Sequence, residues 1–281
     1  MNDASLAIDA KLQRLQEEIG LLREDLTLRL AELHDLEHTE KPHLLAIFQT
    51  KLGPWELRLL KARCNVARWK RKSELIQADI NRGQTPELKK IDDALEEELL
   101  TWHQKLKEAA KKINLAQFRL DHLMEPEDAS ELKKQFRELA KKLHPDVNPD
   151  LDEALRVLWL QVLAAYESSD LQKIKALALI VESKAPLESL GPRAKSAIKS
   201  LQIEHERLRT TLERIYQQLA AIQKQAPFSS RAQWEDAAWL KQRRSDLETQ
   251  EALALEEAAA LEKHVKTLLL FYGTGQQSNF N

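Results

Sequence analysis

Apolar residues recur at steps of four and three along most of this 281-residue chain, and that spacing restricts its fold more than any other feature. The pattern is clearest in residues 4–38, where only Arg29 interrupts it. Heptad spacing is typical of a helix that packs along its length on a partner helix. Only six glycines and nine prolines are present, which agrees with an all-α fold of long antiparallel helical hairpins. The apolar positions of this first segment are Ile8, Leu12, Leu15, Ile19, Leu22, Leu26, Leu33 and Leu36.

Turn-forming residues divide the pattern into separate helices. Three helices are expected in the N-terminal part, at about 4–38, 42–82 and 86–120. The turns between them are short, which makes neighbouring helices antiparallel. Residues 1–112 are therefore interpreted as a three-helix coiled-coil arm.

Two prolines mark possible interruptions of this arm. A turn is expected at residues 38–42, where Thr39 or Glu40 precedes a proline that suits the first turn of a new helix. Gly53-Pro54 lies inside the second helix, and because proline removes a helical hydrogen bond, a kink or a break is expected there. The apolar spacing keeps its phase across this pair, which favours the kink.

The C-terminal part repeats the same organisation. Lys184-Ala185-Pro186 and Gly191-Pro192 indicate a linker. Two further amphipathic segments, interrupted at Ala226-Pro227, predict a helical hairpin over residues 190–272. The polar residues 273–281 are expected to be a disordered tail.

A basic run within residues 58–72 contains a tryptophan, a combination that could bind nucleic acid. The formal net charge of −2 argues against extensive binding to nucleic acid. Folding the chain about Gln84 brings Arg71 level with Glu97, so the basic run meets the acidic residues 96–98. Pairing within the chain is the preferred interpretation, and a nucleic-acid partner is not expected.

The sequence contains few features that indicate the cellular compartment of the protein. The single cysteine, Cys64, excludes an internal disulfide and fits a reducing compartment. The N-terminus shows no basic stretch followed by an apolar one, so no signal peptide is expected. The longest apolar runs, such as residues 176–181, are too short to span a bilayer. We expect a cytoplasmic protein without a membrane partner.

Residues 126–170 are different in character from the coiled segments. Asp128 and Glu131 have the spacing of a capping box, which predicts the start of a helix. One face of this helix is apolar, with Leu132, Phe136, Leu139 and Leu143. The opposite face is basic, with Lys133, Lys134, Arg137, Lys141 and Lys142.

This helix is expected to end at His144, because a residue that precedes proline is displaced from the helical region. Pro145 and Asp146 then favour a rigid, exposed turn. Asp150 and Glu153 form a second capping box, which predicts another helix antiparallel to the first. Its core-facing residues are Leu155, Trp159, Val162 and Tyr166.

The stretch Glu131–Asp150, with His144-Pro145-Asp146 near its end, resembles the second helix and loop of the J-domain of the DnaJ co-chaperone family. Ala165-Tyr166-Glu167 matches a familiar tripeptide of the third helix. The tripeptide His-Pro-Asp alone would be a weak signal, but the basic helix and the spaced core around it make the match specific. The resemblance covers about residues 113–183.

The resemblance implies a function. In the J-domain family, the second helix and the loop dock on a DnaK-type chaperone ATPase and trigger its ATP hydrolysis. His144, Pro145 and Asp146 would then be the trigger, and the five basic side chains would form the docking face. The resemblance also implies a client protein, which the sequence does not identify.

Three features depart from the family pattern. The usual first helix is replaced by residues 118–124, which look merged into the end of the third coiled segment. The short fourth helix is replaced by a longer helix at residues 171–183. Neither a Gly/Phe-rich linker nor a cysteine-rich zinc domain is present in the sequence.

Other functions have weaker support. No nucleophile elbow, phosphate loop or pair of catalytic acids is visible, so the chain is not expected to be an enzyme. His34 and His38 share a helix face, with His43 nearby, and could bind a metal. Solvated histidines on the outside of a coiled coil are the preferred interpretation, so no metal or cofactor is expected.

The remaining alternative is a coiled-coil scaffold in which the J-like segment is only a structural joint. Against this, a joint has no need for His-Pro-Asp on an exposed loop. The apolar seams can close within one chain or across a homodimer, and their spacing does not distinguish these possibilities. The coiled arms are expected to serve client binding, localisation or oligomerisation.

Overall fold

The computed structural model describes the backbone of residues 3–183 and 194–277, and the side chains of residues 10–182 and 198–271. Within these ranges the chain forms helices joined by turns and contains no strand, which confirms the all-α prediction. No helix in the described ranges combines the length and the apolar character needed to cross a bilayer. The predicted linker, marked by residues 184–186 and 191–192, lies outside the described residues.

The chain is divided into two units, each of which combines segments that are far apart in the sequence. One unit contains residues 1–43 and 122–229, and the other contains residues 44–121 and 230–281. This grouping differs from the consecutive arm, J-like unit and hairpin that the sequence suggested. In particular, the two helices of the expected C-terminal hairpin belong to different units.

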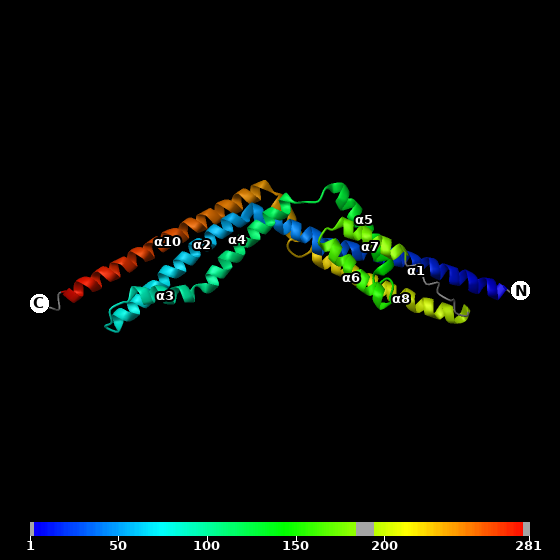
Figure 1. Cartoon of the computed structure of the whole chain (residues 1–281), viewed down its shortest axis with the longest axis horizontal. Coiled ribbons are helices and arrows are strands. Elements are labelled where there is room, and N and C mark those ends of the chain that lie inside the picture. The colour runs from blue at the N-terminus through cyan, green and yellow to red at the C-terminus, as the bar shows by residue number, and fades with distance from the viewer. Residues whose placement is uncertain (1–2, 184–193, 278–281) are drawn as a thin grey trace. The chain divides into compact units, whose positions relative to one another are not determined.

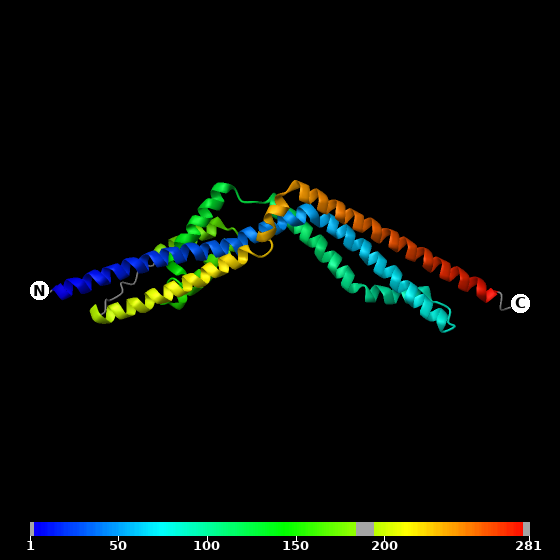
Figure 2. The same ribbon diagram turned by 180° about the vertical axis from the view of Figure 1, so that it is seen from behind.

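In the first unit, α1 (Asp3–Asp35) and α8 (Ala194–Gln223) lie side by side over much of their length (Figure 1, Figure 2). The apolar stripe of α1 therefore has a partner, although it is α8 and not the next helix in the sequence. The buried residues of this α1/α8 seam are Ile19, Leu26, Val147, Leu208, Leu212, Ile215 and Leu219.

Three shorter helices complete this unit: α5 (Pro126–Leu143), α6 (Glu153–Glu167) and α7 (Leu171–Ser183). Each packs on the other two, and α5 also packs on α1 (Figure 1). Their buried residues form one cluster with Ala31 of α1, which we call the hairpin core: Ala31, Leu132, Phe136, Leu139, Ala140, Leu143, Leu158, Trp159, Val162, Ala165, Tyr166, Leu171, Ile174, Leu177 and Val181.

The second unit is built from α2 (Lys41–Asn81), α3 (Leu88–Glu98), α4 (Leu100–Asp121) and α10 (Ala237–Gln277), with the short α9 (Arg231–Glu235) before α10. A 3-10 turn, η2 (Phe228–Ser230), precedes α9. Two apolar clusters join α2 to α10: one contains Leu52, Leu59, Leu240 and Leu247, and the other contains Ile76, Ile91, Leu95 and Val265. Because α10 continues to Gln277, residues 273–277 are helical and not disordered; the rest of the expected tail lies outside the described residues.

Several boundaries differ from the predictions. Residues 38–42 do not form a turn, because a π-helix, η1 (Leu36–Glu40), connects α1 to α2. Pro42 cannot donate the next helical hydrogen bond, and the wider π spacing is one way for a helix to accommodate such a defect.

The helix α2 passes through Gly53-Pro54 without a break. The expected helix 86–120 is interrupted at Leu99, and nothing in the sequence accounts for this interruption.

Opposite charges pair within the second unit, as the basic and acidic runs predicted. Arg71 Nε lies 2.7 Å from Glu98 Oε2, and Arg68 Nη2 lies 3.1 Å from Glu96 Oε1. The register differs by one residue from the expected match of Arg71 with Glu97. Each exposed pair contributes only about 0–1 kcal/mol, so a small change of register has little energetic effect.

Gly53 and Gly20 provide a test of helix packing. A Cβ atom at Gly53 would lie 2.8 Å from Ile113 Cγ1, whereas one at Gly20 would meet nothing within 4 Å. Both glycines are helical, so alanine should gain about 0.5–1 kcal/mol from helix propensity at each. At Gly53 this gain is opposed by overpacking of about 1–3 kcal/mol. We expect Gly53→Ala to lower the free energy of unfolding, measured by urea titration, and Gly20→Ala to raise it; a more stable Gly53→Ala variant would contradict the close packing of α2 on α4.

Candidate functional site

The His-Pro-Asp loop joins α5 to α6. Helix α5 ends at Leu143, and His144 adopts an extended conformation with ψ of 126°, as expected for a residue before proline. Helix α5 begins at Pro126, two residues before the expected capping box. Helix α6 is capped by Asp152, whose Oδ1 accepts a hydrogen bond of 2.8 Å from the Leu155 N–H, in place of the expected Asp150.

Hydrogen bonds within the loop hold it in one shape. The Asp146 N–H donates to His144 Nδ1 at 3.0 Å, and the Asn148 N–H donates to the His144 carbonyl at 2.8 Å. The Asn148 side chain donates from Nδ2 to the Lys141 carbonyl at 2.8 Å. The imidazole of His144 is therefore an acceptor at Nδ1 and is oriented by the backbone of the residue that follows Pro145.

Below the loop, the helices α5 and α6 pack through aromatic residues. The ring of Phe136 is stacked 4.1 Å from that of Tyr166 and 5.6 Å from that of Trp159. The structure places all eight predicted core residues in or against the hairpin core, with Leu155 only partly buried. Of the small members of this core, Ala165 was included through the resemblance to the third J-domain helix, whereas Ala140 was missed because the stripe on α5 was counted from large apolar side chains. Sequence reasoning also missed the stripe on α7, although Leu171, Ile174, Leu177 and Val181 follow the same helical spacing.

The helix that covers the α5–α6 hairpin is α1. Ala31 is part of the hairpin core, and the His34 ring is stacked 5.1 Å from that of Phe136. Asp35 joins the two sides, because its carboxylate accepts a 2.7 Å hydrogen bond from Lys133 Nζ and a 3.1 Å hydrogen bond from the Tyr166 hydroxyl. The expected first helix of the J-like unit does not occupy this place, since residues 113–121 belong to α4 and to the second unit.

His144 points into this packing and not into solvent. It lines a hollow together with Leu30, Leu33 and His34 of α1, and its ring meets the edge of the Trp159 ring at 5.0 Å. Burial lowers the pKa of His144 to about 4, and the nearby Asp146 carboxylate offsets only part of this effect. The histidine of the loop is therefore neutral at pH 7.

Asp146 and Val147 are held by α8. Arg207 Nη1 donates to the Asp146 carbonyl at 2.9 Å, and Arg214 Nη2 lies 3.1 Å from Asp146 Oδ2. Val147 is only 1% exposed and is part of the α1/α8 seam. The loop that was expected to be exposed is thus attached at His144, Asp146 and Val147 to helices that come from distant parts of the sequence. Pro145 remains exposed.

The basic face of α5 is partly occupied as well. Lys133 pairs with Asp35, and Lys141 Nζ lies 3.1 Å from Glu24 Oε1 of α1. The other three basic side chains, of Lys134, Arg137 and Lys142, belong to exposed residues. A positive surface beside the loop is therefore open to solvent, while the loop itself is partly covered.

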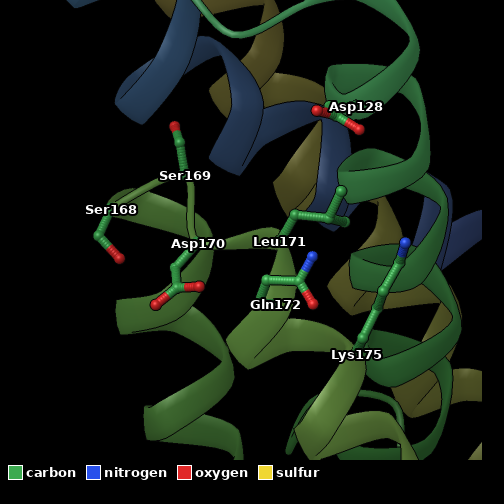
Figure 3. Close-up of a pocket in the computed structure, with 7 residues that line it drawn as sticks. All are labelled: Asp128, Ser168, Ser169, Asp170, Leu171, Gln172 and Lys175. Carbon is green, nitrogen blue, oxygen red and sulfur yellow. The ribbon is translucent and has the colours of Figure 1, made fainter.

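A shallow hollow lies at the other end of the hairpin, where α6 turns into α7. Figure 3 shows Ser168, Ser169 and Asp170 on this turn, with Asp128 across the hollow on α5. Ser169 has a positive φ of 56°, and Asp170 Oδ1 accepts a hydrogen bond of 2.9 Å from the Lys173 N–H. Asp170 therefore caps α7, and the Ser168 hydroxyl donates a 2.8 Å hydrogen bond to the Ala164 carbonyl, so these two polar groups of the hollow serve the turn itself.

Comparison of the chain with protein-family models, with curated proteins and with solved structures gives no match.

Proposed function

We propose that this protein is a J-domain co-chaperone that docks on a DnaK-type chaperone and stimulates its ATP hydrolysis. The observation that carries the proposal is the ordered His144-Pro145-Asp146 turn at the end of a basic helix, α5, which packs on α6. An ordered turn loses little conformational entropy on docking, and the basic face of α5 accelerates encounter with an acidic partner. The protein itself performs no chemistry in this proposal, and it acts in the cytoplasm.

The loop contacts α1 and α8, and we interpret this arrangement as a closed state in which the loop is held away from the chaperone. Docking through the loop requires Asp146 to be accessible, and in the structure Asp146 is bound to Arg207 and Arg214. We interpret this arrangement as one of two populations, because a partner that binds only the open form shifts the equilibrium towards it. Client or partner binding to the α1/α8 seam would have the same effect.

Two features of the arginine contacts weaken the closure of the loop on α8. The Arg214 side chain is 59% exposed, so its pair with Asp146 contributes only about 0–1 kcal/mol. Arg207 Nη2 is buried and has no hydrogen-bond partner in the described part of the chain. A buried donor without a partner costs about 1–3 kcal/mol, which opening to water relieves.

A scaffold remains the second candidate, and one observation favours it. Val147 is buried in the α1/α8 seam, so the loop also serves as a joint between the hairpin and the coiled coil. In that case His144 and Asp146 would contribute to packing alone. The two functions differ in whether a chaperone ATPase responds to the protein.

Steady-state ATP hydrolysis by a DnaK-type chaperone, with and without the full chain, tests the proposal. We expect stimulation by the wild type, and we expect Asp146→Asn and His144→Gln to remove it while the helical circular dichroism is unchanged. His205→Gln, which removes a histidine from α8 outside the loop, is the matched control and should stimulate normally. If neither the wild type nor a variant in which Arg207 and Arg214 no longer hold the loop stimulates the ATPase, the scaffold is the function.

A further inference from the structure

Two histidines and one glutamate converge at the junction of α1, η1 and α6. His34 Nε2 lies 4.0 Å from Glu167 Oε1, and His38 Nδ1 lies 3.6 Å from the same oxygen. All three potential ligand atoms lie within 4.8 Å of one another. His34 and His38 are four residues apart in the sequence, but Glu167 is more than a hundred residues away, so the fold alone brings this group together.

The surrounding contacts fix the backbone segments that carry these three side chains. Asp35, which follows His34, accepts a hydrogen bond from the hydroxyl of Tyr166, which precedes Glu167. This bond sets the register of α1 against the end of α6. His38 lies in the π-helix η1, a kind of helical irregularity that is frequent at functional sites. The imidazole rings of His34 and His38 are stacked 4.3 Å apart, on the same side of the chain.

Glu167 does not satisfy the His34 side chain. The Nε2 atom of His34 is buried and lies 4.0 Å from Glu167 Oε1, which is beyond hydrogen-bond distance. It has no hydrogen-bond partner among the described residues. A buried polar atom without a partner calls for an explanation, and an ion is one that fits its chemistry.

We propose that His34, His38 and Glu167 bind a divalent transition metal ion of the zinc class. Two imidazole nitrogens and one carboxylate oxygen are a ligand set that zinc accepts, with a further coordination position left for water. Bond lengths of about 2.0–2.2 Å in a tetrahedral site place ligand atoms roughly 3.3–3.5 Å apart. The two histidine–glutamate separations are 3.6 and 4.0 Å and all three lie within 4.8 Å, so side-chain rotation is needed to close the set. His38 and Glu167 have the freedom for this, since their side chains are 41% and 45% exposed.

The site would act as a clamp between α1 and α6. An ion bound to His34 and His38 on one side and to Glu167 on the other joins α1 to the hairpin that carries the His-Pro-Asp loop. Because the three ligands converge only in the folded chain, the ion stabilises the folded state over the unfolded one. The proposal does not rest on the co-chaperone function, since the clamp serves a scaffold equally well.

Metal binding by the purified full chain, stripped with a chelator, tests the site directly. Zn²⁺ is added in a calorimetric titration, and Co²⁺ is added in an absorbance titration that reports the coordination geometry of the bound ion. We expect one ion per chain, and a loss of affinity of at least about tenfold in His38→Gln and in Glu167→Gln, because even the loss of a group that only hydrogen-bonds to a metal ligand costs about tenfold or more. Both side chains are partly exposed, so the variants should fold; circular dichroism checks this.

His205→Gln is the matched control, because His205 Nε2 lies 3.4 Å from Glu18 Oε2 but no second histidine completes a set there among the residues described. It should bind Zn²⁺ like the wild type. A Zn²⁺-dependent rise in the melting temperature that is lost in His38→Gln and Glu167→Gln supports the clamp. Absence of Zn²⁺ and Co²⁺ binding, or equal binding by the wild type and both variants, would overturn the proposal. Because no chaperone is present in these measurements, their failure does not bear on the co-chaperone function.

Discussion

Replacing Arg207 and Arg214 together by glutamate is expected to increase the stimulation of a DnaK-type ATPase about tenfold or more at limiting protein concentration. The two arginines hold the Asp146 carbonyl and carboxylate through contacts of 2.9 and 3.1 Å. Charge reversal removes both contacts and adds repulsion next to Asp146. A change of about 1.4 kcal/mol in the equilibrium between closed and open loop is sufficient for a tenfold effect.

The size of the effect follows from the environment of each arginine. The Arg214 pair is largely exposed and contributes about 0–1 kcal/mol, while the partly buried bond from Arg207 to a carbonyl contributes about 1.5–3 kcal/mol. The buried Nη2 atom of Arg207 without a partner reduces this sum. The contact of Val147 with the α1/α8 seam survives in the variant, so the loop is released only in part.

Concentration dependence of ATPase stimulation measures this release, because the open fraction sets the apparent affinity for the chaperone. The matched control is Lys199→Glu with Arg209→Glu, which makes the same change of charge on α8 at exposed positions. Arg209 pairs with Glu213 of its own helix, so the control leaves the loop attached. If the control and the loop variant stimulate equally, the effect comes from net charge and the closed state is not regulatory. Amide hydrogen exchange at Val147 and Asn148 should rise only in the loop variant.

The heptad pattern predicted long helices but not their partners. A stripe such as Ile19 and Leu26 shows that a helix has an apolar face to bury, and many other stripes in this chain could bury it equally well. The choice of α8 as the partner of α1 depends on contacts between residues nearly two hundred positions apart, such as Tyr216 with Asp25. Local spacing carries no information on that choice. The short turns that suggested antiparallel neighbours were misleading at residues 38–42, where the π-helix η1 forms instead of a turn.

The candidate site shows the same division between local and long-range information. The end of α5 at His144 follows from the proline after it, and the structure agrees with this local rule. The contacts that hold the loop against α8 do not follow from local rules. They depend on Arg207 and Arg214, which lie more than sixty residues further along the chain. The same holds for the metal-ligand cluster: His34 and His38 were visible as a pair, but Glu167 joins them only through the packing of α1 on α6.

Acidification between pH 7 and pH 4.5 is expected to destabilise the first unit by about 2–3 kcal/mol through His144 alone. The pKa of His144 is about 4 in the folded state, because burial disfavours the charged imidazolium, and about 6.5 in the unfolded state. Between these values the unfolded chain binds a proton that the folded chain does not. The free energy of unfolding therefore falls as the pH decreases through this window, by 1.36 kcal/mol for each pKa unit, and this contribution ceases to change below about pH 4.

Urea unfolding of the wild type and of His144→Gln at pH 7 and pH 4.5 isolates this contribution. Glutamine does not titrate, so the variant should lose about 2–3 kcal/mol less than the wild type on acidification. The other ionisable groups are present in both proteins and cancel in the difference, apart from His34, whose pKa the neighbouring His144 helps to lower. His205→Gln controls for the loss of a histidine elsewhere in the same unit and should retain the dependence on pH. Equal losses in the wild type and in His144→Gln would mean that His144 is exposed to water in solution, and the loop would then be open rather than closed on α1 and α8.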